Sequence, residues 1–175
     1  MRIDFFISAM EQSCQSPGMS LPEIHMQEAL RMAKEGMENN QGGPFGAVVV
    51  LEGRIVGRGC NSVTSLNDPT AHAEVLAIRD ACRSLGRFEL KGCEIYSSCE
   101  PCPMCLAAIY WARLDSLSYA ATRDDAAEAG FDDAFLYREV ALDQVERSLP
   151  TKMLLRPSAR ELFRDWMSKS DKVTY

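Results

Sequence analysis

Hydrophobic and polar positions change their spacing several times along this chain, and each change predicts a structural element. After Ser20, apolar residues recur every three or four positions, at Met26, Ala29, Leu30, Ala33 and Met37. This spacing predicts a helix over 21–38 with one buried face. A capping box begins the helix, because Glu23 follows Ser20 by three positions and can accept the free backbone N–H of the cap.

Short apolar runs and longer helical segments alternate through the middle of the chain. The runs 46–51, 55–60, 93–97 and 117–121 predict strands, the first two as a hairpin. Two segments, 71–85 and 102–112, predict helices that are apolar almost all round and therefore buried, and Gly86 ends the first of them. This alternation is typical of an α/β fold, in which helices cover a mostly parallel sheet.

The pattern is weaker at both ends of the chain. In the last third we expect a short helix over 123–130, a loop or turn over 131–139, an edge strand over 152–155 and a terminal helix over 158–167 that Ser158 caps. The first 19 residues have no sustained period and are expected to be an appended segment. Because 175 residues suit one domain, we expect a single domain over 20–175.

Composition limits the classes of partner. Lys and Arg total 19 and Asp and Glu total 25, which gives a formal net charge of −6. Proteins that bind nucleic acid usually carry a basic face, so we expect no nucleic-acid partner. There is no run of about 20 apolar residues that could span a membrane, and the first ten residues lack the apolar core of a signal peptide. Seven cysteines in such a chain predict free or metal-bound thiols in a reducing cytoplasm.

Two short segments concentrate side chains that bind metals. One contains His72 and Glu74, the other contains Cys102 and Cys105, and each lies at the start of a predicted helix. Cys102 precedes a proline, which favours the N-cap position and makes Cys105 the third helical residue. Both sulfurs then lie on one face near the positive end of the helix, where thiolates are favoured.

One imidazole and two thiolates form a ligand set that suits zinc and leaves a fourth position for water. The sequence therefore predicts a Zn²⁺ cofactor held by His72, Cys102 and Cys105. We expect the carboxylate of Glu74 beside the fourth position, where it can move protons. The matching reaction is hydrolysis at an amidine-like carbon, with Glu74 delivering protons to the ring nitrogen and then to the departing amine.

Other interpretations of the cysteines stay open on these residues alone. Cys99, Cys102 and Cys105 are similar to part of an iron–sulfur run, although isoleucine stands where the fourth cysteine would be. Cys99 can also complete a structural zinc site that has four protein ligands. A redox pair formed by two of these cysteines would leave His72 and Glu74 without a role.

Four segments are similar to motifs of a known family, namely GGPFGA at 42–47, NDPTAHAE at 67–74, SCEPCPMC at 98–105 and AAEAGFDD at 126–133. A His-x-Glu pair followed by Pro-Cys-x-x-Cys is the signature of zinc nucleobase deaminases. The chain therefore resembles the cytidine deaminase-like superfamily. Within it the chain resembles the bacterial guanine deaminases, which the segment 126–133 favours. The resemblance extends from about residue 21 to the end.

The resemblance implies a fold, a reaction and the residues for each task. The fold is a three-layer α/β/α sandwich around a five-stranded mixed sheet. The reaction is zinc-dependent hydrolysis of guanine, a small nucleobase, to xanthine and ammonia. One zinc ion per chain would be held by His72, Cys102 and Cys105. Glu74 would shuttle protons, and Asp133 would be a second carboxylate near the departing amine. Substrate contacts are implied at Phe45, Asn61, Ala73, Trp111 and Tyr175.

Without the resemblance, several of these residues have ordinary structural explanations. Asn61 is equally well a turn residue, Phe45 a core aromatic, and Trp111 either lines the pocket or packs in the core. Tyr175 would be a frayed end, whereas in the resembling family a C-terminal aromatic closes the site. That family exchanges the terminal segment between two subunits, which implies a domain-swapped homodimer.

Three alternative functions remain. A tRNA adenosine deaminase or a cytosine or nucleoside deaminase would use the same zinc chemistry. The tRNA enzyme would need a basic terminal helix, whereas this chain mixes Arg164 and Lys169 with Asp165 and Asp171. A structural zinc domain with no open coordination position is the alternative from another class.

Overall fold

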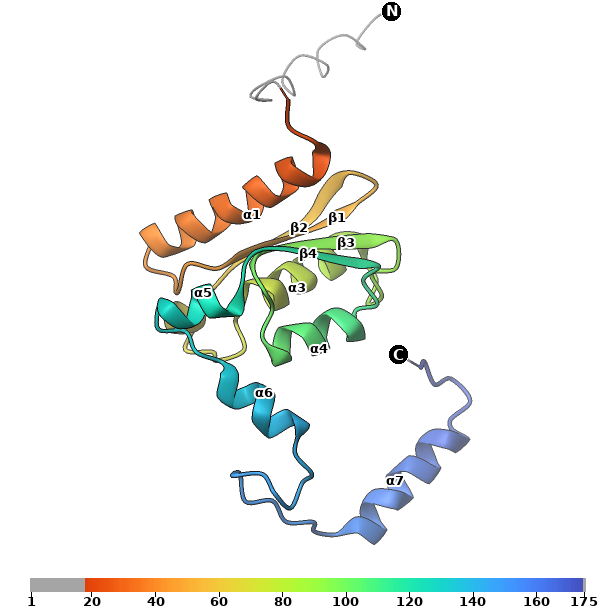
Figure 1. The fold of residues 1–175 in the computed structure, drawn as a ribbon. Helices are drawn as coiled ribbons and strands as arrows, with labels where there is room; N and C mark the ends of the chain where they lie inside the picture. Colours follow the sequence, from red (N-terminus) through yellow and green to blue (C-terminus); the bar gives the residue numbers. More distant parts are fainter. Residues whose placement is uncertain (1–17, 175) are drawn as a thin grey trace, which may run out of the picture.

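The computed structural model describes residues 18–174, so most of the expected appended segment 1–19, and also Tyr175, lie outside the described residues. Along the chain the elements are α1 (Leu21–Glu38), β1 (Gly46–Leu51), β2 (Arg54–Cys60), α2 (Val63–Leu66), α3 (Ala73–Leu85), β3 (Cys93–Cys99), α4 (Pro103–Trp111), β4 (Ser116–Ala121), α5 (Arg123–Glu128), α6 (Ala134–Ala141) and α7 (Arg156–Ser168) (Figure 1). None of the helices in this range is long and apolar enough to cross a bilayer.

The strands form one mixed sheet in the order β2-β1-β3-β4. β1 pairs antiparallel with β2 and β3, whereas β3 and β4 are parallel and joined through α4. The expected α/β fold with a mixed sheet is confirmed, but the expected fifth strand is wrong for residues 18–174. The candidate edge strand, 152–155, lies in the connection between α6 and α7 and joins no ladder there. A segment without a strand partner forms no ladder hydrogen bonds.

Helices cover both faces of the sheet (Figure 1). Successive side chains of β1 point alternately to one face and the other. On one face, α1 packs against Val48 and Val50 through Ala29. On the other face, α3 and α4 pack against Ala47 and Val49. β1 is buried on both faces, as its continuous apolar run predicts.

Small residues bring α3 close to the sheet. A Cβ added at Gly59 would lie 2.2 Å from the carbonyl oxygen of Ala73, and one at Gly57 would lie 2.4 Å from that of Ala77. Backbone contacts backbone at these points, so glycine is the residue that fits. Because Ala73 is the first residue of α3, Gly59 fixes where that helix begins relative to β2.

Two predicted helix ends agree with the structure, the start of α1 and the end of α3, whereas α3 begins at Ala73, two residues later than expected. α1 begins at the expected capping box of Ser20 and Glu23, and Gly86 ends α3 in the left-handed conformation with φ of 63°. The short helix expected over 123–130 is α5, which begins after Thr122 and ends two residues early. The four-residue α2 had no counterpart among the predicted elements.

The expected loop or turn over 131–139 is wrong, because α6 occupies most of it. Asp133 is the N-cap of α6, and Oδ1 of Asp132 accepts the backbone N–H of Ala134 at 2.8 Å. The side chain of Asp132 therefore stabilises the first turn, whereas that of Asp133 forms no capping hydrogen bond. With only eight residues, the helix has too short an apolar pattern to be distinguished from a turn.

The terminal helix, α7, begins at Arg156 and therefore earlier than the expected Ser158 cap. Leu155 is its N-cap, and Pro157 lies in the first turn, where a missing backbone N–H has no cost. We call residues 142–174 the C-terminal arm. In Figure 1 the arm leaves α6 and carries α7 apart from the sheet, on the side where α4 lies.

We expect Gly59→Ala to lower the free energy of unfolding by ~2–3 kcal/mol, because the new methyl group overlaps the backbone of α3. It should also weaken metal binding, since α3 carries His72 at its start. Urea denaturation measures the stability, and a zinc titration measures the affinity. Ser84→Ala, on an exposed position of α3, is the control and should stay within ~0.5 kcal/mol of the wild type. An unchanged Gly59→Ala protein would contradict the close approach.

Candidate active site

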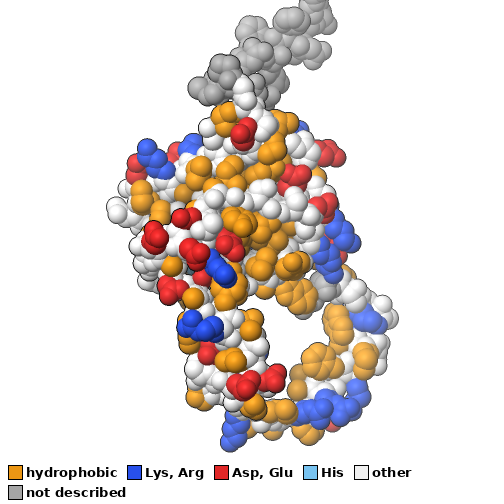
Figure 2. All heavy atoms as spheres, in the orientation of Figure 1, with side chains coloured by type: hydrophobic (Ala, Val, Ile, Leu, Met, Phe, Trp, Pro, Cys, Tyr) orange, Lys and Arg blue, Asp and Glu red, His pale blue; other side chains and the backbone are white. Residues whose placement is uncertain are grey.

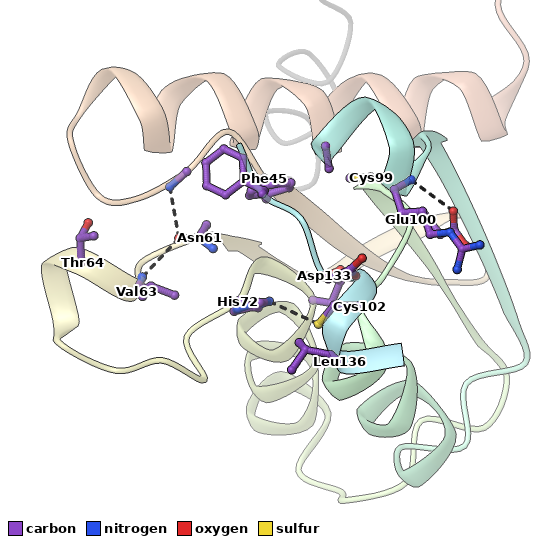
Figure 3. A pocket seen from close by; sticks show the side chains of 15 residues that line it. Phe45, Asn61, Val63, Thr64, His72, Cys99, Glu100, Cys102, Asp133 and Leu136 are labelled. Carbon is purple, nitrogen blue, oxygen red and sulfur yellow. Dashed lines mark hydrogen bonds between the residues drawn. The ribbon is translucent and has the colours of Figure 1, made fainter. Parts of the chain in front are cut away.

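Two helix N-termini meet at the candidate site. His72 is the N-cap of α3, and Cys102 is the N-cap of α4, with Pro103 at the first helical position and Cys105 at the third. The expected N-cap position of Cys102 is confirmed. Nδ1 of His72 lies 3.7 Å from Sγ of Cys102 and 3.5 Å from Sγ of Cys105. Residues distant in the sequence are thus joined at one point (Figure 3).

These three side chains form a set that fits a metal ion. Their ligand atoms all lie within 4.8 Å of one another, and Cys105 is fully buried. Among the His, Cys, Asp and Glu residues of 18–174, these three form the group whose ligand atoms are close enough together to hold a metal ion. One nitrogen and two sulfurs at this spacing suit zinc and leave one coordination position for a non-protein ligand. Cys99 is not part of this group, and its Sγ donates to the carbonyl oxygen of Thr122 at 3.4 Å.

His72, Cys102 and Cys105, which we call the ligand trio, influence one another's protonation. Hydrogen bonds from Cys105 and His72 lower the pKa of the Cys102 thiol to about 4, in spite of its burial. The same bond to Cys102, together with burial, raises the pKa of Cys105. Hydrogen bonding to Cys102 also raises the pKa of His72. A cation that binds the trio must displace these protons, which is the usual behaviour of thiolate and imidazole sites.

Glu74 lies beside the trio and is deeply buried. Only 6% of its surface is exposed, and it lines the same cavity as His72 and Cys102. Burial raises the pKa of this carboxyl group, since a low-dielectric surrounding disfavours the charged form. A carboxyl group with a raised pKa can both accept and donate protons near neutral pH.

A cavity of about 290 Å³ opens in front of these residues. Its size is near the lower end of the range for small-molecule sites. Figure 3 places His72, Cys102 and Asp133 together on one side, with Asn61 and Phe45 across the cavity. The cavity is lined by Gly43, Phe45, Asn61, Val63, Thr64, His72, Glu74, Cys99, Glu100, Cys102, Arg123, Ala126, Phe131, Asp133 and Leu136.

The side chain of Asn61 is held in one orientation. Its Oδ1 accepts the backbone N–H of Gly43 at 3.2 Å and that of Val63 at 3.3 Å. A Cβ added at Gly42 would lie 2.2 Å from the same oxygen. Since the oxygen is occupied by the protein, the amide nitrogen is the group left to face a ligand.

Two aromatic rings form a corner of the cavity. Phe45 and Phe131 pack edge to face, with ring centroids 4.9 Å apart. A Cβ added at Gly43 would lie within 3.1 Å of both rings. The face of Phe45 is therefore fixed where it can stack on a planar ligand.

Asp133 lies on the α6 side of the cavity, close to Cys102 (Figure 3). Burial and the neighbouring Cys102 raise the pKa of its carboxyl group, and Arg123 opposes this shift. The cavity therefore has two carboxyl groups, Glu74 and Asp133, each with a raised pKa.

Two of the other predicted site residues, Ala73 and Trp111, lie outside the cavity lining. Ala73 is fully buried directly after His72. Trp111 lies at the far end of α4 and lines a second hollow together with residues of the C-terminal arm. Tyr175 is outside the described residues.

Several lining residues were not among the predicted site residues. Phe131 stands inside the quoted segment 126–133 and could have been found there. Val63 belongs to the unpredicted α2. Arg123 and Leu136 gave no signal, because their roles as lining residues depend on how α5 and α6 fold back over the metal-binding side chains.

Comparison with known sequences agrees with this geometry. The family model described as the cytidine and deoxycytidylate deaminase zinc-binding region matches residues 19–121. The chain is 49% identical to guanine deaminase of Bacillus subtilis over 153 residues, which are 87% of this chain and 98% of that protein. It is 46% identical to a tRNA-specific adenosine deaminase of Aquifex aeolicus over 99 residues, which are 57% of this chain and 65% of that protein.

Solved structures of guanine deaminases are also similar to this chain. The guanine deaminase of Bacillus subtilis matches with a TM-score of 0.85 over 87% of this chain and 98% of that chain. A guanine deaminase from Nitrosomonas europaea, 35% identical, matches with a TM-score of 0.62 over 66% of this chain and 67% of that chain.

We expect Cys102→Ala to lose zinc, because it removes one of three ligand atoms. The loss of affinity should exceed the ~10–100-fold that removing an outer hydrogen-bond partner of a metal ligand costs. Atomic absorption on the purified protein measures the zinc content. Cys82→Ala is the matched control: its thiol on α3 bonds to the carbonyl oxygen of Phe88 and lies outside the trio. Full zinc content in Cys102→Ala would contradict the ligand set.

The matched range 19–121 contains both segments that carry the ligand trio. The identity to the Bacillus subtilis protein extends over nearly all of both chains. This chain belongs to the cytidine and deoxycytidylate deaminase zinc-binding family.

Proposed function

We propose that this chain is a zinc-dependent guanine deaminase, which converts guanine and water to xanthine and ammonia. The observation that carries the proposal is one cavity that combines the ligand trio with the buried Glu74 and a wall suited to a planar base. Similarity to a guanine deaminase over nearly the whole length of both proteins favours guanine over other bases.

In this proposal His72, Cys102 and Cys105 hold one zinc ion per chain. When bound, zinc acts as a Lewis acid and makes water a competent nucleophile near neutral pH. Glu74 takes one proton as water attacks the carbon that bears the amine, and passes it to the adjacent ring nitrogen. It then carries the second proton of the water to the amine, so that the C–N bond breaks and ammonia leaves. Both protons of the water are thereby accounted for.

The remaining lining residues orient the base. The amide nitrogen of Asn61 donates to a ring or carbonyl acceptor of guanine, because its oxygen is already occupied. Phe45 stacks on the purine, and Ala73 contributes to the edge of the site at the start of α3. Asp133 faces the departing amine from the α6 side and accepts a hydrogen bond from it.

The C-terminal arm supports a homodimer in which this segment is exchanged. Its apolar side chains are left in water by the single chain, including Leu162 at 71%, Phe163 at 69% and Trp166 at 40% exposure. Outside the arm, Trp111 in α4 and Tyr119 in β4 are exposed as well. Figure 2 shows hydrophobic side chains along the arm and on the part of the body that faces it. Exposed apolar surface of this extent is usually an interface.

A second copy is the partner that fits both surfaces. The outer edge of β4 is unpaired within the described chain, and an unpaired edge is usually covered in the native assembly. In the exchanged dimer, the arm of one subunit covers the region of α4 and β4 of the other, and Tyr175 closes the partner's site.

The other parts of the proposal concern the whole chain. Residues 20–175 act as a single domain, to which 1–19 are appended. No disulfide joins the six cysteines in the described range, which agrees with a reducing cytoplasm.

An ammonia-release assay tests the substrate. Guanine, adenine, cytosine, cytidine and tRNA are each offered to the same sample, and zinc is measured in parallel. We expect release from guanine and none from tRNA. Release from tRNA and not from guanine would replace this proposal with the tRNA alternative, whose relatives match a shorter part of the chain.

We expect Glu74→Gln to keep zinc and to lose about 10²–10⁴-fold in kcat, because the amide cannot move protons. Zinc content and guanine turnover are measured on the same preparation. The control is Glu128→Gln, which changes an exposed carboxylate at the end of α5 and should leave turnover unchanged. A Glu74→Gln enzyme with normal turnover would exclude this mechanism.

We expect two inactive variants to restore activity when they form mixed dimers. One carries Glu74→Gln and the other lacks Tyr175. In an exchanged dimer, the subunit with intact Glu74 receives Tyr175 from its partner, so one complete site forms. Co-expression with two affinity tags isolates the mixed dimer, and guanine turnover is then measured. A mixed dimer without recovered activity would contradict the exchange.

A further inference from the structure

Tyr137 joins α6 to the segment that carries the metal ligands. Its hydroxyl group donates to the carbonyl oxygen of Pro101 at 3.1 Å, and Pro101 is the residue before Cys102. The side chain is partly buried and does not line the cavity. A single hydrogen bond therefore connects the middle of α6 to the start of α4.

The ring of Tyr137 is also held from a second direction. The guanidinium carbon of Arg123 lies 4.9 Å from the ring centroid, a distance at which a cation is attracted to an aromatic face. The backbone N–H of Arg123 donates to Oε2 of Glu100 at 3.3 Å (Figure 3), and the backbone N–H of Glu100 donates to the carbonyl oxygen of Ala121. Tyr137 is thus fixed between α5 and the 100–102 segment.

Asp133 stands one helical turn before Tyr137. Residues four apart lie on the same face of a helix, so the face of α6 that carries Tyr137 also carries Asp133 toward the cavity. Figure 3 places Asp133 next to Cys102. The position of this carboxylate relative to the ligand trio therefore depends on how α6 is held.

Few other contacts hold α6 in place. Phe135 is 51% exposed, Leu136 45% and Val140 65%, and the helix has no fully buried residue. A short helix with little buried surface opens easily, so a single well-made hydrogen bond has a large share in fixing its orientation.

We propose that Tyr137 is a positioning residue of the deamination reaction: its hydrogen bond to Pro101 sets the carboxylate of Asp133 against the metal ligands. The inference rests on the proposed function of the site. It predicts that the Tyr137 hydroxyl group matters to turnover only as long as Asp133 is a carboxylate.

Tyr137→Phe is the sharpest test, because it deletes the hydroxyl group and keeps the ring under Arg123. We expect kcat for guanine to fall about 10-fold, with KM within twofold and zinc content unchanged. The matched control is Tyr96→Phe, which deletes a hydroxyl group bonded to Glu94 on the α1 face of the sheet and should leave kcat unchanged.

A double-mutant cycle with Asp133→Asn separates positioning from general stability. We expect Tyr137→Phe to cause no further loss in the Asp133→Asn protein. An equal loss of kcat in both backgrounds, an unchanged kcat in Tyr137→Phe, or a loss of zinc from Tyr137→Phe would each overturn the proposal.

Hydrogen exchange distinguishes failure of this inference from failure of the substrate proposal. The backbone amides of 134–141 should exchange faster in Tyr137→Phe than in Tyr96→Phe. If the wild type deaminates another base, the same cycle is run with that base. If the wild type deaminates none, the proposed function fails, and unchanged exchange over α6 would overturn the position-setting role as well.

Discussion

The close approach of α3 to β2 is the constraint on which the site depends. Gly59 and Gly57 lie against the backbone of α3, with no room for a side chain between them. The helix therefore begins next to the end of β2, and His72 and Glu74 line the same cavity as Asn61. The parallel step from β3 through α4 to β4 then delivers Cys102 and Cys105 to the same point. Chemistry at this site follows from backbone packing, and the polar side chains occupy the positions that the packing provides.

The site uses the ends of helices for two purposes. N-cap positions point side chains beyond the helix, so His72 and Cys102 reach a common point from two directions. The positive ends of the helix dipoles also favour thiolate over thiol, and hydrogen bonds from Cys105 and His72 lower the pKa of Cys102 in the same direction. Asp133 and Leu136, which lie beside these ligands (Figure 3), come from α6, which has much less buried surface. The site thus combines a rigid half, carried by α3 and α4, with a loosely held half, carried by α6.

The sequence predicted the rigid half better than the loose one. The proline at 103 placed Cys102 at a helix cap, and the burial of β1 on both faces followed from its continuous apolar run. Residues 131–139 were misjudged because an eight-residue helix has too few turns to establish a period, and its side chains pack against little. The edge strand 152–155 was misjudged because a strand is defined by its neighbour, and the sequence of one segment does not contain the neighbour. Arg123 and Tyr137 escaped notice for a related reason: their contacts arise from the fold of α5 and α6 over the 100–102 segment.

The separation of the ligands along the chain has a consequence for folding. His72 and Cys102 are 30 positions apart, and β3 lies between them. An ion bound by both would act as a cross-link, which restricts the unfolded chain in the way that a disulfide does. Removal of the ion by a chelator should therefore loosen the region of α3 and α4, which is otherwise the best packed part of the molecule. The cell's supply of zinc would then govern the lifetime of the protein as well as its activity.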